Sequence, residues 1–566
     1  MLQQLVRDAG RIVGELPPPM YDRKPVKWIL ELDGAGRLLG VVQTSGGGKT
    51  DRGLSRMVPF DVRTSGIKAI LLADTPAYTL GIPFDDARAA DKHTAYRAQV
   101  ESCAAATGHT GVQAVARFLA TWDTNGEPTG ERLGATLEKG DLLTFRVDGM
   151  LPVDDPSIQA FWAAACRMET TETAQCLVCG QLKTIPENLP VLLKRVPGGQ
   201  SSGIALVSIN ADAFESYALP RATTSRVCTD CGERFGKTLN HLLAAEDGHL
   251  AIGPLVYVFW TRQGGGFSWA TLLKQPQADA VRALLNVYRT GVPFTAVDAD
   301  DFYATALTAS GGRAVVRDWL HTTVGEAATH LARWFTLTRQ VDAYGQPGEP
   351  LGLYRLAASL YRDANKEMVA QVPQALVRAA LHGGPLPNWL LTQAVNRCRA
   401  EQQVTYPRAA LMKAVLQSLC IEKEADMEQL ELSETRPAYL CGRLLAVLEE
   451  VQRAAQGKIN TTLVDRFFGA ASTAPASVFG NLLGDAQPHL AKLRRTRPGV
   501  YQALQQRLEA VMVNLPAFPP TLTLKDQALF SLGYYHQRAH DRAEMLARKV
   551  AGDTALTEII EEESHE

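Results

Sequence analysis

Two cysteine pairs give the strongest chemical signal in the sequence. Cys176 and Cys179 enclose two residues, Cys228 and Cys231 enclose two more, and a glycine follows each pair. Zinc takes four ligands in a tetrahedron, and a Cys-X-X-Cys turn presents two thiolates from one side. Two such turns predict a zinc-ribbon-like structural site with no open position for catalysis. Thiols without metal and a redox dithiol are the alternatives, although no thioredoxin-like strand and helix surround the pairs.

Two glycine-rich loops could contact nucleic acid. The first, Gly46-Gly47-Gly48-Lys49-Thr50, resembles a phosphate-binding loop, but Gln43 stands where that motif needs a glycine and a poor helix start follows. Lys49 is therefore a candidate contact to a nucleic-acid phosphate, while nucleotide hydrolysis and a plain surface loop stay open.

The second glycine-rich loop runs from Pro197 to Gly203. Its amide side chains suit base edges and its serines suit phosphates, and two cations precede it. A tight structural hairpin is the alternative. The candidate DNA-binding residues here are Lys194, Arg195, Gln200, Ser201, Ser202 and Asn210.

A basic cluster lies far along the chain, on an expected C-terminal helix. It contains Lys492, Arg494, Arg495 and Arg497. Such a cluster can hold a DNA backbone with salt-dependent affinity, and a solvated helix face is the alternative. By contrast, the sequence contains no His-Glu-X-X-His and no Gly-X-Ser-X-Gly motif, so catalysis is poorly supported.

Composition limits the class of protein. The 566 residues are 46% hydrophobic and 21% charged, which excludes a disordered or collagen-like chain. The net charge of -2 excludes a histone-like polycation, so nucleic acid must meet local basic surface. Nine cysteines are too few for a disulfide framework. Without an apolar run of about 18 residues or a secretory signal, we expect a cytoplasmic protein with no membrane contact.

The secondary structure that must position these residues is expected to change from mixed strands and helices to helices along the chain. Strands are expected at 26–32, 37–43, 67–74, 141–147, 205–209 and 255–260, and helices at 91–106, 111–122 and 158–168. Beyond about residue 275 the pattern is almost wholly helical, with apolar stripes such as the one from Leu440 to Val451. The predicted fold class is α+β: a mixed N-terminal body with a zinc-ribbon-like insertion, followed by an all-α C-terminal helical bundle.

We therefore expect four segments. Residues 1–150 form a strand-rich N-terminal body, and residues 151–270 form a zinc-ribbon-like module with the glycine-rich loops. Residues 271–410 form a helical middle region, and residues 411–566 form the C-terminal bundle.

Several runs of sequence resemble one known family, the large subunit of the type I-C CRISPR surveillance complex (Cascade). The resemblance begins at the Gly-Gly-Gln-Ser-Ser-Gly loop and its continuation to Tyr217, and it recurs in order along the chain. The other runs are Val316–Trp319, Tyr406–Leu411, Phe467–Phe479, His489–Leu493 and Ser531–Arg538. One departure is visible, because relatives can carry a threonine in place of the second cysteine of the first pair. In that case zinc would stabilise the fold of this member locally and would not be part of the mechanism that the family shares.

The resemblance implies a non-catalytic, DNA-binding subunit. Its partners would be a guide RNA (crRNA), double-stranded target DNA, the Cascade backbone subunits, the guide-processing subunit and a helicase-nuclease. The subunit would recognise the short flanking motif (PAM) and help to open the duplex, while RNA–DNA pairing supplies sequence specificity. The C-terminal bundle resembles the small subunit of these complexes, which can arise by internal translation, here from Met412 or Met427.

Two other classes of function stay open. One is a nucleic-acid-associated ATPase or nuclease that uses the Lys49 loop or an unrecognised carboxylate cluster. The other is a scaffold without DNA contact.

Overall fold

The computed structural model describes most of the chain in two compact units. The described residues are 1–44, 46, 52–63, 66–122, 133–168, 173–209, 212–215, 219, 224–263, 268–290, 299–419, 427–457 and 459–563. The N-terminal unit comprises Met1–Arg195, Gly199–Leu243 and Ser310–Ala314; the C-terminal unit comprises Val196–Gly198, Ala244–Ala309 and Val315–Glu566. The four-segment division remains a prediction.

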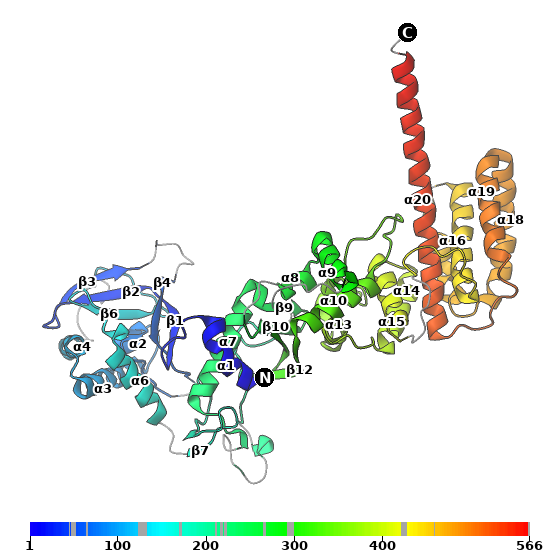
Figure 1. The fold of residues 1–566 in the computed structure, drawn as a ribbon. Helices are drawn as coiled ribbons and strands as arrows, with labels where there is room; N and C mark the ends of the chain where they lie inside the picture. The colour runs from blue at the N-terminus through cyan, green and yellow to red at the C-terminus, as the bar shows by residue number, and fades with distance from the viewer. Residues whose placement is uncertain are drawn as a thin grey trace. The chain divides into compact units, whose positions relative to one another are not determined.

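A four-stranded sheet and a two-stranded ribbon organise the N-terminal unit (Figure 1). Its strands are β1 (Tyr21–Val26), β2 (Trp28–Leu32), β3 (Leu38–Gln43), β4 (Leu54–Pro59), β5 (Ala73–Asp74), β6 (Leu143–Val147), β7 (Thr173–Gln175) and β8 (Leu182–Thr184). Its helices are α1 (Leu2–Val13), α2 (Pro76–Thr79), α3 (Ala89–Thr107), α4 (Thr110–Thr121), α6 (Pro156–Met168) and α7 (Thr229–Ala244).

The sheet has the strand order β3-β2-β6-β5. β2 and β3 form the expected antiparallel hairpin, and its turn closes because Gly36 adopts a φ of 85° and donates its backbone N–H to Asp33 O at 2.9 Å. β2 also pairs with β6 in parallel. β1 and β4 form the separate ribbon, with Val26 opposite Leu54. This ribbon carries the cations Arg23 and Lys24 outside its buried positions.

A second four-stranded sheet opens the C-terminal unit, in the order β12-β11-β10-β9. These strands are β9 (His249–Ile252), β10 (Leu255–Thr261), β11 (Asp301–Ser310) and β12 (Arg313–Thr323). β10 is buried over almost its whole length, as its run of apolar residues indicated. β11 and β12 were not predicted, so the expectation of an almost wholly helical chain beyond residue 275 is wrong for residues 301–323.

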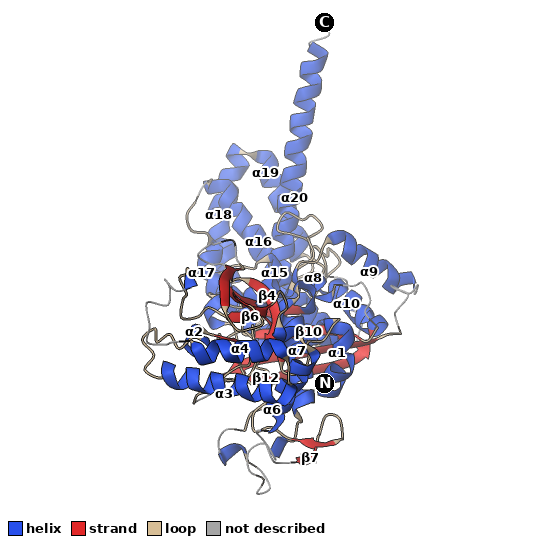
Figure 2. Ribbon diagram, turned by 90° about the vertical axis from the view of Figure 1, so that its left-hand side faces the viewer, coloured by secondary structure: helices blue, strands red, loops and turns tan. Residues whose placement is uncertain are grey.

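Helices make up the rest of the C-terminal unit. They are α8 (Trp269–Lys274), α9 (Ala278–Thr290), α10 (Val324–Thr338), α11 (Leu353–Ala358), α12 (Ala364–Glu367), α13 (Gln371–His382), α14 (Asn388–Glu401), α15 (Tyr406–Leu419), α16 (Pro437–Gln456), α17 (Leu463–Ala471), α18 (Phe479–Thr496), α19 (Pro498–Met512) and α20 (Leu524–Glu563). The last five follow one another in the chain with no strand between them, and Figure 2 draws them as blue helices. The α+β fold class with a helical C-terminal region is thus confirmed.

The final helices pack closely because two glycines allow it. A Cβ on Gly442 of α16 would collide with the backbone of Phe530, and a Cβ on Gly533 of α20 would collide with the backbone of Tyr439. The two helices therefore meet backbone to backbone. The predicted apolar stripe of α16 is fully buried, from Leu440 through Leu444 to Val451.

His536 lies at the centre of a buried polar network in this unit. The Tyr439 hydroxyl lies 2.8 Å from His536 Nδ1, and His536 Nε2 lies 3.1 Å from Gln340 Oε1. Burial, together with the nearby Lys413 charge, lowers the pKa of His536 to about 3. The imidazole is therefore neutral at neutral pH, with Nε2 donating to Gln340.

Acidification should destabilise the C-terminal unit through His536. The pKa is depressed in the folded state, so the unfolded state binds the proton first, and stability is lost as pH falls from about 6.5 toward 3. Between pH 7.5 and 4.5 the loss from this one group is about 2.5 kcal/mol. Denaturant unfolding at both pH values should show that His536→Gln removes this part of the pH dependence. An unchanged pH dependence in the variant would contradict the assignment.

Two expected strands are absent or shorter in the described residues. Only Ala73–Asp74 of the segment 67–74 is a strand, and in the segment 205–209 only Ala205 forms a bridge, with Arg313. Among the helices that the structure describes, none combines the length and apolar character that a membrane crossing requires.

Candidate functional site

The four predicted cysteines come together in the N-terminal unit. Cys176 and Cys179 lie in the turn between β7 and β8, Cys228 precedes α7, and Cys231 lies in its first turn. Their Sγ atoms all lie within 4.8 Å of one another, and Cys179 and Cys228 are 4.0 Å apart. A tetrahedral zinc with bonds of about 2.3 Å separates its sulfur ligands by about 3.8 Å. The cluster could therefore bind a metal such as zinc.

The surroundings of the sulfurs favour thiolate at one position. Burial disfavours ionisation of Cys176, but backbone N–H groups of Cys228, Cys179 and Val178 outweigh burial and lower its pKa to about 7. Two of these N–H groups lie close to the sulfur: Cys228 N is 3.3 Å and Val178 N is 3.4 Å from Cys176 Sγ. Burial raises the pKa of Cys228 to about 11. A bound cation would stabilise the thiolates that burial opposes.

Because four thiolates complete a tetrahedron, the cluster suits a structural role. It ties the β7–β8 hairpin to α7, and the segment between the two cysteine pairs carries the second glycine-rich loop. α7 also holds that segment directly, since Asn240 Nδ2 donates to Leu192 O at 2.9 Å and Lys194 N donates to Asn240 Oδ1 at 2.8 Å.

The second glycine-rich loop is a tight hairpin with polar side chains at its tip. Leu193 and Ile204 exchange two backbone hydrogen bonds of 2.8 Å. Gly203 adopts a φ of 108° and donates to Gln200 O at 2.9 Å, and a Cβ there would meet Leu192. The hairpin geometry leaves the side chains of the predicted residues at the surface: Lys194, Arg195, Gln200, Ser201 and Ser202 are all exposed.

A cavity of about 770 Å³ brings Lys194 together with cations that were not predicted. Arg23 and Lys24 of β1 and Arg52, just before β4, line the same cavity. None of the four cations forms an ion pair with a carboxylate within the described ranges. The same lining holds one further cation and two carboxylates: Lys27 lies 3.0 Å from Asp141 and 3.5 Å from Glu138, so these three groups together add one negative charge. We call this cavity the four-cation cavity, after Arg23, Lys24, Arg52 and Lys194.

The electrostatics of the cavity favour an anion. Burial lowers the pKa of Lys24, and the charges of Arg63 and Lys194 lower it further, whereas the carboxylates of Asp22 and Asp74 raise it. Like charges that are held close together repel one another, and a phosphate placed among them reduces that repulsion. A local signal existed in the sequence, since Arg23, Lys24 and Lys27 form a short basic run.

Two predicted DNA-binding residues fall outside the described residues. These two residues are Lys49 and Asn210, and their contacts with DNA remain predictions. Lys49 is nevertheless close in sequence to Arg52, which lines the four-cation cavity.

The predicted C-terminal basic cluster lies at the end of α18. Lys492, Arg494, Arg495 and Arg497 are all exposed, and none has an ion-pair partner in the part of the chain that the structure describes. Arg497 Nη1 donates to Ala454 O at 3.4 Å, which brings this end of α18 against the last turn of α16. The cluster is far in sequence from the four-cation cavity and belongs to the other unit.

Comparison with known proteins assigns the chain to one family over most of its length. No curated protein matches the sequence. The family model described as CRISPR-associated protein (Cas_Csd1) matches residues 2–541, a range that includes every candidate site residue. The chain therefore belongs to the Cas_Csd1 family of CRISPR-associated, Cascade-type proteins.

Proposed function

We propose that this chain is the non-catalytic large subunit of a type I-C CRISPR RNA-guided surveillance complex. It recognises the PAM on double-stranded target DNA, promotes R-loop formation, stabilises the displaced strand and helps to recruit the helicase-nuclease. The guide RNA supplies most of the sequence specificity by base pairing, so the protein needs to read only the short motif and the backbone.

The four-cation cavity is the observation that carries this proposal. Duplex DNA presents about one phosphate charge per 1.7 Å of helix axis, and neutralising those charges releases counterions. A chain with a net charge of -2 has little general attraction for DNA, so a concentrated, unpaired set of cations marks the surface that meets it. Arg23, Lys24, Arg52 and Lys194 supply that set.

The hairpin tip beside Lys194 suits the reading of bases. The Gln200 amide offers a donor and an acceptor in one plane, which matches a base edge, and the Ser201 and Ser202 hydroxyls suit phosphates. In this arrangement the cavity positions the duplex and the hairpin tip contributes specificity. The cysteine cluster supports both through α7, with zinc as the structural metal.

The C-terminal bundle would follow the displaced strand. Its basic cluster at the end of α18 can neutralise phosphates without reading sequence. A separate small subunit from the same gene fits a start at Met427, which follows α15 and precedes α16. Met412 fits poorly, because it lies in the middle of α15 and a start there would cut that helix.

Crosslinking tests whether this chain touches target DNA at all. A duplex target that carries photoreactive groups next to the flanking motif is bound by the assembled complex and irradiated. We expect crosslinks to peptides of β1, to the segment at Arg52 and to the hairpin at Lys194, because these line the four-cation cavity. Crosslinks confined to other subunits would contradict the proposal and leave this chain as a scaffold.

A further inference from the structure

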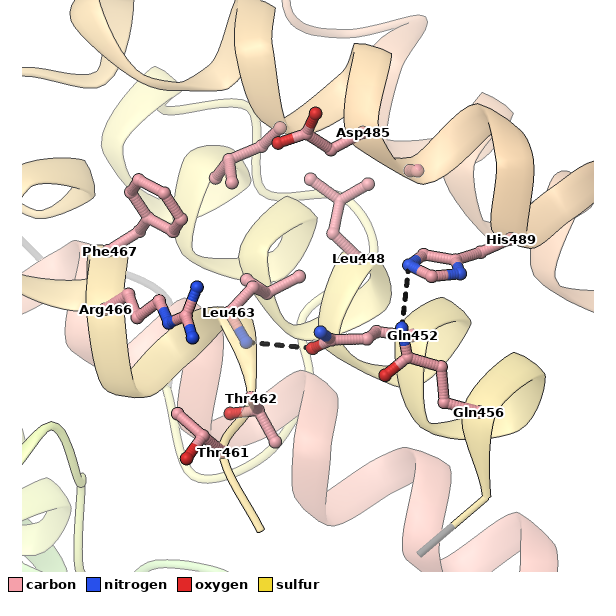
Figure 3. Close-up of a pocket in the computed structure, with 12 residues that line it drawn as sticks. Leu448, Gln452, Gln456, Thr461, Thr462, Leu463, Arg466, Phe467, Asp485 and His489 are labelled. Atoms are coloured by element: carbon pink, nitrogen blue, oxygen red, sulfur yellow. Dashed lines mark hydrogen bonds between the residues drawn. The ribbon is translucent and has the colours of Figure 1, made fainter. Parts of the chain in front are cut away.

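A polar cavity in the C-terminal bundle is lined by residues to which the proposed function assigns no role. It has a volume of about 390 Å³, within the range of roughly 300–1,000 Å³ that is usual for ligand sites. α16, α17, α18 and the segment before α17 surround it. Figure 3 shows Gln452, Gln456 and His489 along one side, with Arg466 and Phe467 on the other.

The cavity presents both donors and acceptors. Gln452 Oε1 accepts a hydrogen bond of 2.8 Å from Leu463 N, which fixes the amide and leaves its Nε2 donor directed elsewhere (Figure 3). Gln456 Nε2 lies 3.4 Å from His489 Nε2, which leaves the Gln456 Oε1 acceptor available. Flat groups with donors and acceptors on one edge, such as nucleobases, match such an arrangement.

Two charged side chains line the same cavity without neutralising each other. Neither Arg466 nor Asp485 forms an ion pair within the described ranges, although both contribute to the lining. A carboxylate accepts from the amino and imino groups of a base, and a guanidinium donates to its carbonyl or ring nitrogen atoms. The half-buried ring of Phe467 adds apolar surface on which a base face can pack.

The nearby cations indicate that the occupant is part of a nucleic-acid strand. His489 and Asp485 belong to the same helix, α18, whose end carries the basic cluster of Lys492, Arg494, Arg495 and Arg497. Arg497, the last residue of the cluster, donates to Ala454 O of α16, two residues before Gln456, so the cluster lies near the Gln456 end of the cavity. Phosphates on these cations would leave an adjoining base within reach of the cavity.

We propose that this cavity binds one unstacked base of a single-stranded nucleic acid, while the basic cluster holds the adjoining phosphates. The inference rests on the proposed path of the displaced strand along the bundle. It adds a base-binding subsite to a surface that would otherwise contact only the backbone. The ligand chemistry is shared by the displaced DNA strand and by single-stranded RNA, and the DNA strand is the expected source.

Binding of short single strands to the full-length chain tests the subsite. Three labelled oligonucleotides are compared: DNA with bases, the same DNA backbone with abasic residues, and RNA. We expect the base-containing DNA to bind about tenfold more tightly than the abasic strand, since packing and pairing of one base contribute about that much. Tighter binding of RNA than of DNA that is lost in the cavity variants described below would assign the same subsite to RNA.

Variants separate the cavity from the basic cluster. Asp485→Ala and Gln456→Ala should each reduce the preference for bases and leave abasic binding and its salt dependence unchanged. Gln487→Ala is the matched control, because Gln487 is an exposed residue of α18 outside the cavity. Lys492→Ala should instead weaken all three strands and lower the salt dependence.

Equal binding of abasic and base-containing strands would overturn the proposal, and so would a base preference that survives both cavity variants. Such a failure is distinguishable from failure of the proposed function. Recognition of the flanking motif on duplex DNA by the assembled complex depends on the N-terminal unit, and the cavity variants should leave it intact.

Discussion

Replacing Lys24 and Lys194 together with alanine should weaken binding of the duplex target by the assembled complex about a hundredfold or more. Each charge-assisted hydrogen bond to a phosphate contributes about 1.5–3 kcal/mol, and both residues line the four-cation cavity without a carboxylate partner in the described ranges. The slope of log affinity against log salt concentration should become shallower by about two, because each lysine neutralises about one phosphate. All targets should be weakened alike, because phosphate binding carries no base information.

The same variant should not lose stability, which separates a binding role from a structural one. Burial and the neighbouring charges of Arg63 and Lys194 lower the pKa of Lys24, so these positive charges oppose one another in the free protein. Their removal should keep or raise the melting temperature. Arg37→Ala is the matched control, because Arg37 is an exposed cation of the same unit that pairs with Asp33 at 2.7 Å. An unchanged affinity, or equal losses in the control, would contradict the role of the cavity.

Removal of the metal should destabilise the N-terminal unit strongly. Structural zinc stabilises small zinc domains by roughly 10–16 kcal/mol, and even part of that would lower the melting temperature of a unit of this size by about 10 °C or more. Cys231→Ser should have this effect, because Cys231 is buried and its replacement leaves three thiols close together. The expected metal content of the purified chain is one zinc, measured by elemental analysis.

Chelation supplies the second readout of the metal site. A strong chelator should lower the melting temperature of the wild-type protein to that of Cys231→Ser and leave the variant unchanged. Cys166→Ser is the control, since Cys166 belongs to the same unit but lies outside the cluster. Absence of zinc from the wild-type protein, with the same melting temperature in chelator, would remove the proposed role of the cysteines.

The cysteine cluster could be predicted from the sequence because its information is local. Each Cys-X-X-Cys turn brings two ligands together by itself, and only the meeting of the two pairs depends on the fold. The apolar stripe of α16 could also be predicted from local sequence, because apolar residues that repeat with a period of 3.6 residues indicate which side of a helix is buried. The exposed hairpin tip at Gln200 followed from glycines that permit the turn.

The features that were not predicted depend on pairing between distant residues. β11 is buried on both faces, so its apolar and small residues do not alternate, and alanines such as Ala304 and Ala306 favour helix in isolation. The four-cation cavity arises only when β1 pairs with β4 and when the segment at Lys194 lies against α7. No periodic pattern in the sequence predicts those pairings, although the short basic run that begins at Arg23 can be read from the sequence.

A gel shift on randomised flanking triplets tests the central claim most directly. The complex is assembled with guide RNA, with and without this chain, and bound to guide-matched duplexes that differ only in the triplet beside the target. Affinity should depend on the triplet only when the chain is present, and Gln200→Ala should weaken that dependence more than it weakens assembly. A triplet preference that persists without the chain would show that another subunit reads the flanking motif.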